Sequence, residues 1–393
     1  MQKRLLAAAV AGALAAPAIA LAQSTVQIYG QAQFEYGRLD QGKGRPSTDY
    51  LESTGSYLGF RGTEALGGGL QAWFQCETTM DIRAFDQTGL CSRNSGLGFR
   101  GGFGNVWAGR WHTPFSRIFG MGSPGVEETG LLGFSGIHGG SGSTSFVEQG
   151  SGDAGGANRQ RFRRRESCLM TYETPNFSGF MVGVAASCGN GATPDSGTDI
   201  TDATKNDKAR LYSIAGTYIR GPLGLGIAYQ KHEDVGPRTV LGPQLDDKAT
   251  GASAKYTFGS VTVGATYMDR RWDTVLGEVK NKTWTLATEW NISGPHVLMA
   301  AYGDTGESKG EGTVGVGGAG SSGTMPGGTD NSGYSTIALG YQYNLSKRTS
   351  MKIGWTRYDN DSNSTAHRPF NTPTLLGAGQ ELDNYALVVK HRF

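Results

Sequence analysis

The chain has 393 residues, of which 63 are Gly and 13 are Pro, and its 36 Lys and Arg nearly balance its 34 Asp and Glu. This balanced charge predicts no nucleic-acid partner. Beyond the N-terminus no apolar run reaches the length of about eighteen residues that a membrane-spanning helix requires, so helical membrane spans are excluded.

The N-terminus has the pattern of a secretory signal peptide. MQKRLLAAAVAGALAAPAIALAQS places two cations before a short Ala-rich apolar stretch, which ends in an Ala-Leu-Ala cleavage pattern. The stretch contains Pro17 and is too short for a membrane anchor. We therefore expect residues 1–22 to be cleaved after Ala22 and residues 23–393 to form the exported protein.

The exported part consists of short segments in which apolar and polar residues alternate. In TVQIYGQAQFEYG, Val26, Ile28 and Phe34 share one face and polar side chains share the other. The same alternation predicts about sixteen β-strands. They lie near 25–37, 56–62, 70–79, 94–102, 104–111, 167–173, 179–187, 209–219, 224–232, 249–258, 260–270, 282–291, 295–303, 333–344, 348–358 and 382–393.

The connections between these segments also alternate, in length. Tight connections rich in turn formers, from GTEALGGG to NLSKR, are interleaved with long polar ones, as at 189–208, 233–248, 304–332 and 359–382. Short turns at one end and long loops at the other, with one apolar face, are typical of outer-membrane barrels. A soluble sandwich would not sort its loops by length. The sequence thus predicts an all-β antiparallel transmembrane β-barrel of about sixteen strands.

The chain ends in LDNYALVVKHRF, an amphipathic strand whose last residue is Phe393. A free terminus normally frays, and a soluble domain gains little by leaving an aromatic residue there. We therefore expect this strand to pair with the first one and to close the barrel, because the bilayer penalises an unpaired strand edge.

Three stretches resemble the general porins of Gram-negative bacteria, and above all the β-proteobacterial type found in Burkholderia, Comamonas and Neisseria. They are SYLGFRGTEALGGGLQAWFQCE at 56–77, SGLGFRGGFGNVWAGRWHTPF at 95–115 and MTYETPNFSGFMVGVAAS at 170–187. The resemblance implies a homotrimeric outer-membrane diffusion channel whose third extracellular loop folds into a water-filled lumen. It also implies contact with outer-membrane lipid and lipopolysaccharide, and assembly by periplasmic chaperones and the barrel-assembly machinery, with Phe393 as part of the assembly signal.

The third loop falls at about 112–166 and supplies candidate charges for a constriction. Its candidate acids are Glu127 and Glu128, and its candidate cations are Arg161 and Arg163. A narrow opening of low dielectric focuses such charges and biases which ions enter.

The barrel wall supplies inward-facing cations. Arg61, Arg100 and Arg110 are predicted to face the lumen, opposite Phe60, Phe99 and Trp111, because an Arg facing lipid near the midplane would cost roughly 2–4 kcal/mol.

In related porins a ladder of basic wall residues faces acids of the third loop, and by motif position Arg165 and Arg61 match two of its rungs. The sequence departs from the family pattern at Tyr57 and Gly96, and the nearby Arg93 is a further candidate although its parity is outward. Together these cations predict a pore that favours anions.

Four cysteines allow three pairings. We expect Cys76 to pair with Cys91 across the loop after the third strand, and Cys168 to pair with Cys188 across the TPNFS turn, while the other pairings stay open. No C-x-x-C motif occurs, and no metal or cofactor is predicted.

Alternative functions are a substrate-selective channel, or an enzyme or adhesin on the same barrel. The G-x-S-x-G match at 306–310 lies in a polar loop without a strand-to-helix elbow. Tyr29 and Tyr57, on the lumen parity, are candidate contacts for a sugar. We therefore predict a non-enzymatic, general diffusion channel.

Overall fold

The structure of the chain is a computed structural model that describes residues 25–42, 45–83, 86–87, 89–126, 131–132, 162–163, 165–187, 210–233, 245–318, 321–364 and 378–393. The described residues form mainly β-strands. No helix among them is long and apolar enough to cross a membrane.

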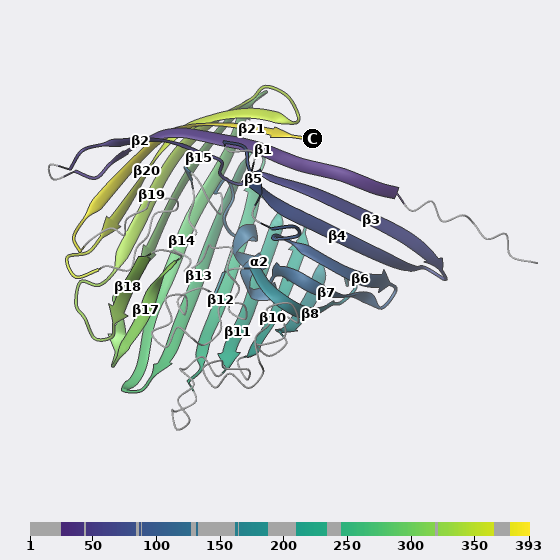
Figure 1. The fold of residues 1–393 in the computed structure, drawn as a ribbon, viewed down its shortest axis with the longest axis horizontal. Coiled ribbons are helices and arrows are strands. Elements are labelled where there is room, and N and C mark those ends of the chain that lie inside the picture. Colours follow the sequence, from purple (N-terminus) through teal and green to yellow (C-terminus); the bar gives the residue numbers. More distant parts are fainter. Residues whose placement is uncertain are drawn as a thin grey trace, which may run out of the picture.

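Sixteen antiparallel strands form one closed barrel (Figure 1), as the alternation of the sequence predicts. Each strand pairs with the strands that precede and follow it around the wall. These strands are β1 (Thr25–Asp40), β3 (Tyr57–Gly67), β4 (Leu70–Asp81), β6 (Ser95–Gly101), β7 (Gly104–His112), β8 (Arg165–Glu173), β9 (Phe180–Ser187), β10 (Arg210–Arg220), β11 (Leu223–Glu233), β12 (Asp247–Phe258), β13 (Val261–Thr274), β14 (Gly277–Ser293), β15 (His296–Thr305), β19 (Tyr334–Asn344), β20 (Thr349–Asn360) and β21 (Glu381–Arg392).

The first strand closes the barrel by pairing with β3 along one part of its length and with β21 along another. The register sets Phe34 opposite Val389 and Gln31 opposite Arg392. Beyond the last strand, the Phe393 N–H donates to the Gly30 carbonyl at 3.1 Å, and the Gly30 N–H donates to the Phe393 carbonyl at 3.1 Å. The predicted pairing of the terminal strand with the first is confirmed.

Connections are short at one end of the barrel, where two-residue turns such as 68–69, 102–103 and 259–260 join the strands. At the other end the sequence predicts long loops between the strands, and the connection between β13 and β14 is an exception. The strands β13 and β14 continue to a two-residue turn at 275–276, so 271–281 is mostly strand rather than loop. The fully buried Trp272 and Val279 pair directly in this extension, and their packing keeps the ladder intact.

Smaller elements lie in the long connections. They are β2 (Thr48–Glu52), which pairs with β1, the two-residue strands β5 (Asp86–Gln87) and β16 (Lys309–Gly310), the hairpin of β17 (Thr313–Gly318) and β18 (Ser321–Pro326), and the helix α2 (Pro114–Met121).

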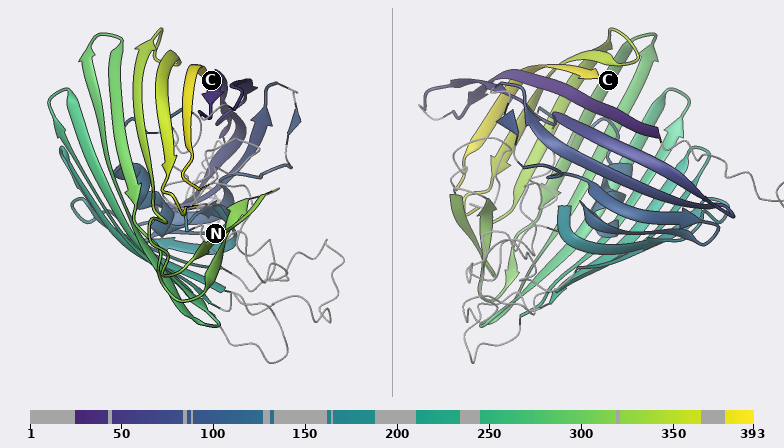
Figure 2. Two further views of the ribbon diagram at one scale, coloured as in Figure 1. Left: turned by 90° about the vertical axis from the view of Figure 1, so that its left-hand side faces the viewer. Right: turned by 45° about the vertical axis from the view of Figure 1, so that its right-hand side comes forward.

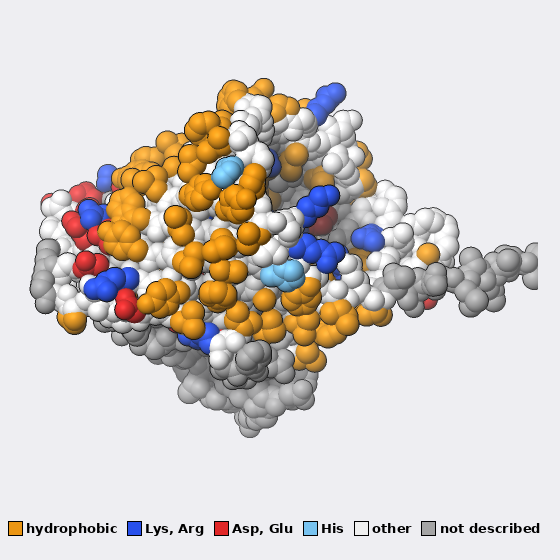
Figure 3. Space-filling view, turned by 90° about the horizontal axis from the view of Figure 1, so that it is seen from above, with side chains coloured by type: hydrophobic (Ala, Val, Ile, Leu, Met, Phe, Trp, Pro, Cys, Tyr) orange, Lys and Arg blue, Asp and Glu red, His pale blue; other side chains and the backbone are white. Residues whose placement is uncertain are grey.

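The two faces of the wall differ in chemistry. On β1, Ile28 and Tyr36 are exposed on the outer face, whereas Gln33 and Glu35 are buried on the inner face. Figure 3 shows apolar side chains over much of the wall seen from above, with acidic and basic side chains together at its left end and further basic side chains right of the centre. The largest buried apolar cluster lies inside the barrel, where residues of the third loop meet the inner wall. The polarity is therefore that of a barrel with an apolar exterior and a mostly polar lumen.

Candidate functional site

The helix α2 of the third loop lies on the inner side of the wall (Figure 2). Thr113 caps its N-terminus by accepting the Ser116 N–H, and Pro114 begins the first turn, where its missing N–H costs nothing. The Thr113 hydroxyl also donates to Gln230 Oε1 at 2.7 Å, and the Phe115 N–H donates to Ser213 Oγ at 2.9 Å. These polar contacts fix the start of the helix against β10 and β11.

Apolar contacts hold the rest of the helix. Phe115, Ile118 and Phe119 are fully buried against the inner faces of β10, β11 and β12. Glycine makes room for them, since a Cβ at Gly251 would lie 2.5 Å from the Phe119 ring. The helix α2 thus packs on a part of the inner wall where glycine leaves no side chain in its way.

The described residues after α2 continue along the inner wall. Pro124 lies against Gly264 of β13, and Gly125 lies against Met299 of β15. Leu132 then lies against Gly340 of β19. The third loop therefore contacts the wall at sites far from the strands β7 and β8 that carry it.

Leu131 and Leu132 of the third loop contact the inner wall near β1 and β20. Leu131 and Leu132 are buried, and the Leu131 N–H donates to Glu35 Oε2 at 2.9 Å. The Leu131 carbonyl accepts the hydroxyl of Thr356 from β20. Glu35 also accepts the Tyr50 hydroxyl of β2 at 2.5 Å, so one carboxylate joins the first strand, the first loop and the third loop. Glu35 was not among the predicted site residues, and its only signal in the sequence is an acid on the lumen parity of β1.

Two of the predicted wall cations extend into open space on the inner face. Arg61 stacks over the Tyr29 ring at 4.7 Å and its Nε–H donates to Gln27 Oε1 at 2.9 Å. The Arg100 Nε–H donates to Gln71 Oε1 at 2.8 Å. Both side chains are exposed.

The wall cations do not lie at one level of the barrel. Arg100 pairs with Asn105, next to the pair that leads into the 102–103 turn. Arg110 pairs with Ser95, closer to the loop end, and Arg165 pairs with His112 still further along. The structure thus distributes the predicted cations from the turn end toward the loop end rather than around a single ring.

Arg93 faces inward, although strict alternation of inward and outward residues would place it on the outer face. Its Nε–H donates to Glu77 Oε1 at 2.6 Å, and its guanidinium group lies 5.1 Å from the centre of the Tyr57 ring. The alternation does not apply because Arg93 lies in a bend before β6 begins. Glu77, which also accepts the Tyr29 hydroxyl at 3.3 Å, is a wall acid that was not among the predicted site residues.

The parity assigned to Trp111 is wrong. Its ring lies 5.0 Å from the ring of the buried Trp107 and packs against an inner cluster that includes Leu169. Trp107 and Trp111 are four residues apart in β7 and so share one parity, which the structure places inside. The neighbouring Arg110 donates to Ser167 Oγ at 2.9 Å.

The remaining candidates differ in how they are placed. The Arg165 Nε–H donates to Asn94 Oδ1 at 3.1 Å. Arg163 is buried, with its guanidinium group 5.4 Å from the centre of the Phe119 ring of α2. Glu127, Glu128 and Arg161 lie outside the described residues, and so does the signal segment.

The structure confirms one predicted disulfide. Cys76 and Cys91 are bonded, with their Cα atoms 4.7 Å apart. Cys168 is also disulfide-bonded, whereas Cys188 lies outside the described residues.

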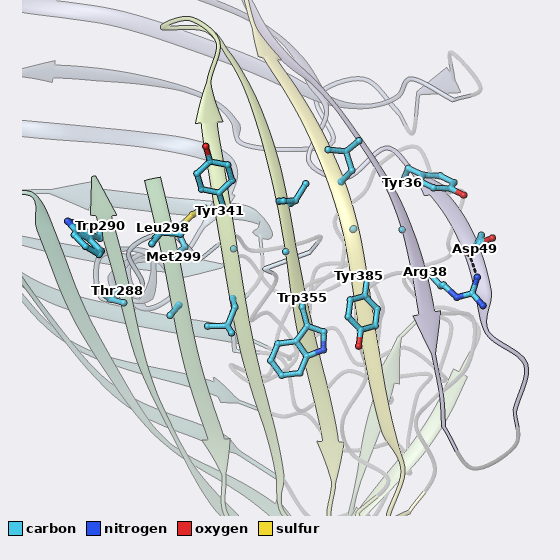
Figure 4. A pocket seen from close by; sticks show the side chains of 18 of the residues that line it. Tyr36, Arg38, Asp49, Thr288, Trp290, Leu298, Met299, Tyr341, Trp355 and Tyr385 are labelled. Carbon is cyan, nitrogen blue, oxygen red and sulfur yellow. Dashed lines mark ion pairs between the residues drawn. The ribbon is translucent and has the colours of Figure 1, made fainter. Parts of the chain in front are cut away.

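The outer wall carries an apolar groove of about 1160 Å³ that crosses β14, β15, β19, β20, β21 and β1 (Figure 4). Aromatic side chains from neighbouring strands border it, among them Trp290, Tyr341 and Trp355. The exposed ion pair of Arg38 with Asp49 lies at one edge. Such a surface is stable in water only when it is covered, by lipid or by another protein surface.

Comparisons with known proteins agree with this architecture. The family model of the Gram-negative porins matches residues 7–363. The outer membrane porin protein 32 of Delftia acidovorans is 30% identical over 89% of this chain and 88% of its own length. The major outer membrane protein P.IB of Neisseria meningitidis is 23% identical over 77% of this chain and 76% of its own.

Solved structures share the fold. An anion-selective porin from Comamonas acidovorans superposes with a TM-score of 0.74 over 94% of this chain and all of that one, at 22% identity. From the closed barrel, its polar lumen and these matches, we conclude that the chain belongs to the Gram-negative porin family and is an outer-membrane protein.

Proposed function

We propose that the protein is a homotrimeric general diffusion porin that passes small hydrophilic solutes and favours anions. The observation that carries the anion preference is the pair of exposed, inward-facing cations, Arg61 and Arg100, whose Nε–H groups are held by neutral glutamines. Fixed cations along a low-dielectric lumen raise the local concentration of anions. The name of the Comamonas porin of the same fold points in the same direction.

In this proposal the loop at 112–166 narrows the lumen, because its described residues already lie along the inner wall from β10 to β20. Arg110, Arg165 and Arg93 complete the basic wall, and Glu127 and Glu128 are the proposed acids of the loop. Residues 1–22 are removed on export, and residues 23–393 form one barrel.

The charge of the two exposed arginines is expected to set the ion preference. Changing Arg61 and Arg100 to Glu reverses two lumen charges and leaves the outer face untouched. The zero-current potential of the purified protein in a KCl gradient is expected to move toward cation selectivity. The shift should be larger at low salt, because screening acts over about 10 Å at 0.1 M. Planar-bilayer recordings measure it.

The control is Arg38→Glu, which changes an exposed arginine of the outer face that is paired with Asp49. We expect this variant to keep the wild-type potential. An unchanged potential in the double variant would remove the two arginines from the selectivity of the pore.

Assembly into trimers is expected from the porin family, and the apolar groove of the outer wall is a surface that a neighbouring chain could cover. Light scattering of the purified protein in mild detergent should give the mass of three chains, which dissociate on heating. A monomer under these conditions would refute the trimer without affecting the barrel.

The competing functions make different predictions. A substrate-selective channel would show conductance that one solute blocks, and the aromatic pair of Tyr29 with Tyr57, 6.1 Å apart, is the place where a ring could bind. An enzyme or an adhesin on this barrel would not need to conduct. Conductance without block by any of a series of sugars and organic acids would favour the general channel.

A further inference from the structure

The outer face of β11 to β14, which lie side by side in Figure 1, carries a row of cations near the loop end of the barrel. In the register of the strands each cation lies directly opposite the next. The row consists of Lys231 of β11, Lys248 of β12, Arg271 of β13, Lys280 of β14 and Lys309 of β16. The cations of β12 and β13 face outward, because their chain neighbours Asp247 and Trp272 are buried on the inner face.

The charges of this row are only partly balanced by the protein. Like charges directly opposite each other across a sheet are destabilising. Lys231 forms ion pairs with two acids, at 2.7 and 2.9 Å, and Arg271 forms one at 3.1 Å. Among the residues that the structure describes, Lys248 and Lys280 form no ion pair. The row thus keeps positive charge on both sides of Arg271, and an anion from outside the chain would compensate it.

An apolar groove of about 600 Å³ runs along the same outer wall, on the side of the row that faces the turn end. Small residues line it, among them Gly216, Ala252 and Ala265, and the exposed side chains of Ile227 and Tyr267 border it. This surface faces the apolar part of the membrane, because it belongs to the outer face of the strands that form the wall. A groove of this composition is suited to a hydrocarbon chain.

The groove and the row are four residues apart on each of three neighbouring strands. The pairs are Ile227 and Lys231 on β11, Ala252 and Lys248 on β12, and Tyr267 and Arg271 on β13. Four residues span about 14 Å along a strand, and the even offset keeps both members of a pair on one face. The wall therefore places an apolar groove and positive charge in line, with the charge toward the loop end, which is extracellular in outer-membrane barrels.

We propose that this part of the wall binds a lipid of the outer leaflet whose headgroup carries phosphate groups. The phosphates lie against Lys248, Arg271 and Lys280, and an acyl chain lies in the groove. Cations near a membrane surface attract anionic headgroups, and a guanidinium group matches the oxygens of a phosphate. The larger groove across β14 to β1 is the surface that a neighbouring chain could cover, so this one is left to lipid. The site lies outside the lumen and does not depend on what the pore conducts.

The test measures lipid binding to the exported protein, purified in mild detergent, by native mass spectrometry. The probe is a synthetic disaccharide lipid with two phosphate groups and several acyl chains. The wild type is expected to bind it at least tenfold more tightly than phosphatidylcholine, whose headgroup has no net charge. Changing Lys248 and Lys280 together to Gln is expected to raise the apparent Kd about tenfold or more, because each cation near an anionic headgroup contributes about a factor of five.

A second variant tests the groove. Ala252→Leu places a larger side chain in it and is expected to raise the apparent Kd of the lipid about threefold or more. Inorganic phosphate at the same concentrations is expected not to displace the lipid, since it has no chain for the groove. Both variants should keep the single-channel conductance and the ion preference of the wild type, because the changed residues face outward.

The matched control changes Arg38 and Arg220 together to Gln, which removes two charges from exposed arginines outside the row. Its apparent Kd should equal that of the wild type. The proposal is overturned if the lysine variant binds the lipid like the wild type, or if the control loses as much. It is also overturned if phosphatidylcholine or inorganic phosphate binds as tightly as the probe. A lower mass of the Ala252→Leu assembly in light scattering would show that another chain covers the groove, which overturns the proposal as well.

Discussion

Removing Phe393 is expected to lower the amount of protein in the outer membrane to less than about a tenth of the wild-type amount, because unpaired backbone groups in the bilayer cost several kcal/mol each. Phe393 and Gly30 exchange two backbone hydrogen bonds of 3.1 Å, which extend the closing ladder beyond β21. The Phe393 ring packs on Gly30, where an added Cβ would lie 2.5 Å from it. Deletion therefore opens the seam and exposes it to lipid.

Outer-membrane fractions analysed by heat-modifiable gel mobility measure this effect. Phe393→Tyr keeps an aromatic ring and both backbone bonds, so this control should accumulate like the wild type. Gly30→Val should reproduce the defect, since its side chain would meet both the Phe393 ring and the Tyr57 carbonyl. Truncated protein that folds is expected to conduct normally, because the seam lies in the wall and not in the lumen. Wild-type accumulation without Phe393 would contradict this role of the terminal residue.

Releasing the third loop from the wall is expected to raise the single-channel conductance by about twofold, because the current through a pore follows its narrowest cross-section. Leu131 and Leu132 are buried against β19 and β20, where Gly340 and Gly354 leave room for them. Changing both leucines to Ser removes apolar burial worth about 1.5–3 kcal/mol for each side chain. Leu131 and Leu132 should then leave the wall, and deletion of residues 120–155 sets the upper limit of the effect.

Planar-bilayer recordings at fixed KCl concentration measure the conductance. Leu345→Ser changes an exposed leucine in a turn at the other end of the barrel, and should leave the conductance as it is. Glu35→Ala removes the acceptor of the Leu131 N–H and should act in the same direction as the leucine changes. If the double variant and the deletion both conduct like the wild type, the loop does not limit the current.

Site residues within regular strands could be predicted from the sequence, whereas those in irregular segments could not. Arg61 and Arg100 could be placed on the inner face because each lies within a regular strand directly after an outward-facing Phe. Arg93 could not, because it lies in a bend. Trp111 was misplaced although it shares the parity of the buried Trp107, because an aromatic residue beside an arginine does not by itself show which of the two faces lipid.

The sequence by itself determined the number and order of the wall strands and the closure through the terminal strand, and it favoured the Cys76–Cys91 bond among the possible pairings. These features depend on alternation, turn residues and spacing, which act between residues that are neighbours along the chain or across one turn. Only the tertiary structure decided that Leu131 meets Glu35 and Thr356, and that glutamines rather than acids hold two lumen arginines. Such contacts join segments far apart in the chain, and no local pattern specifies which inward side chains will meet once the barrel has closed.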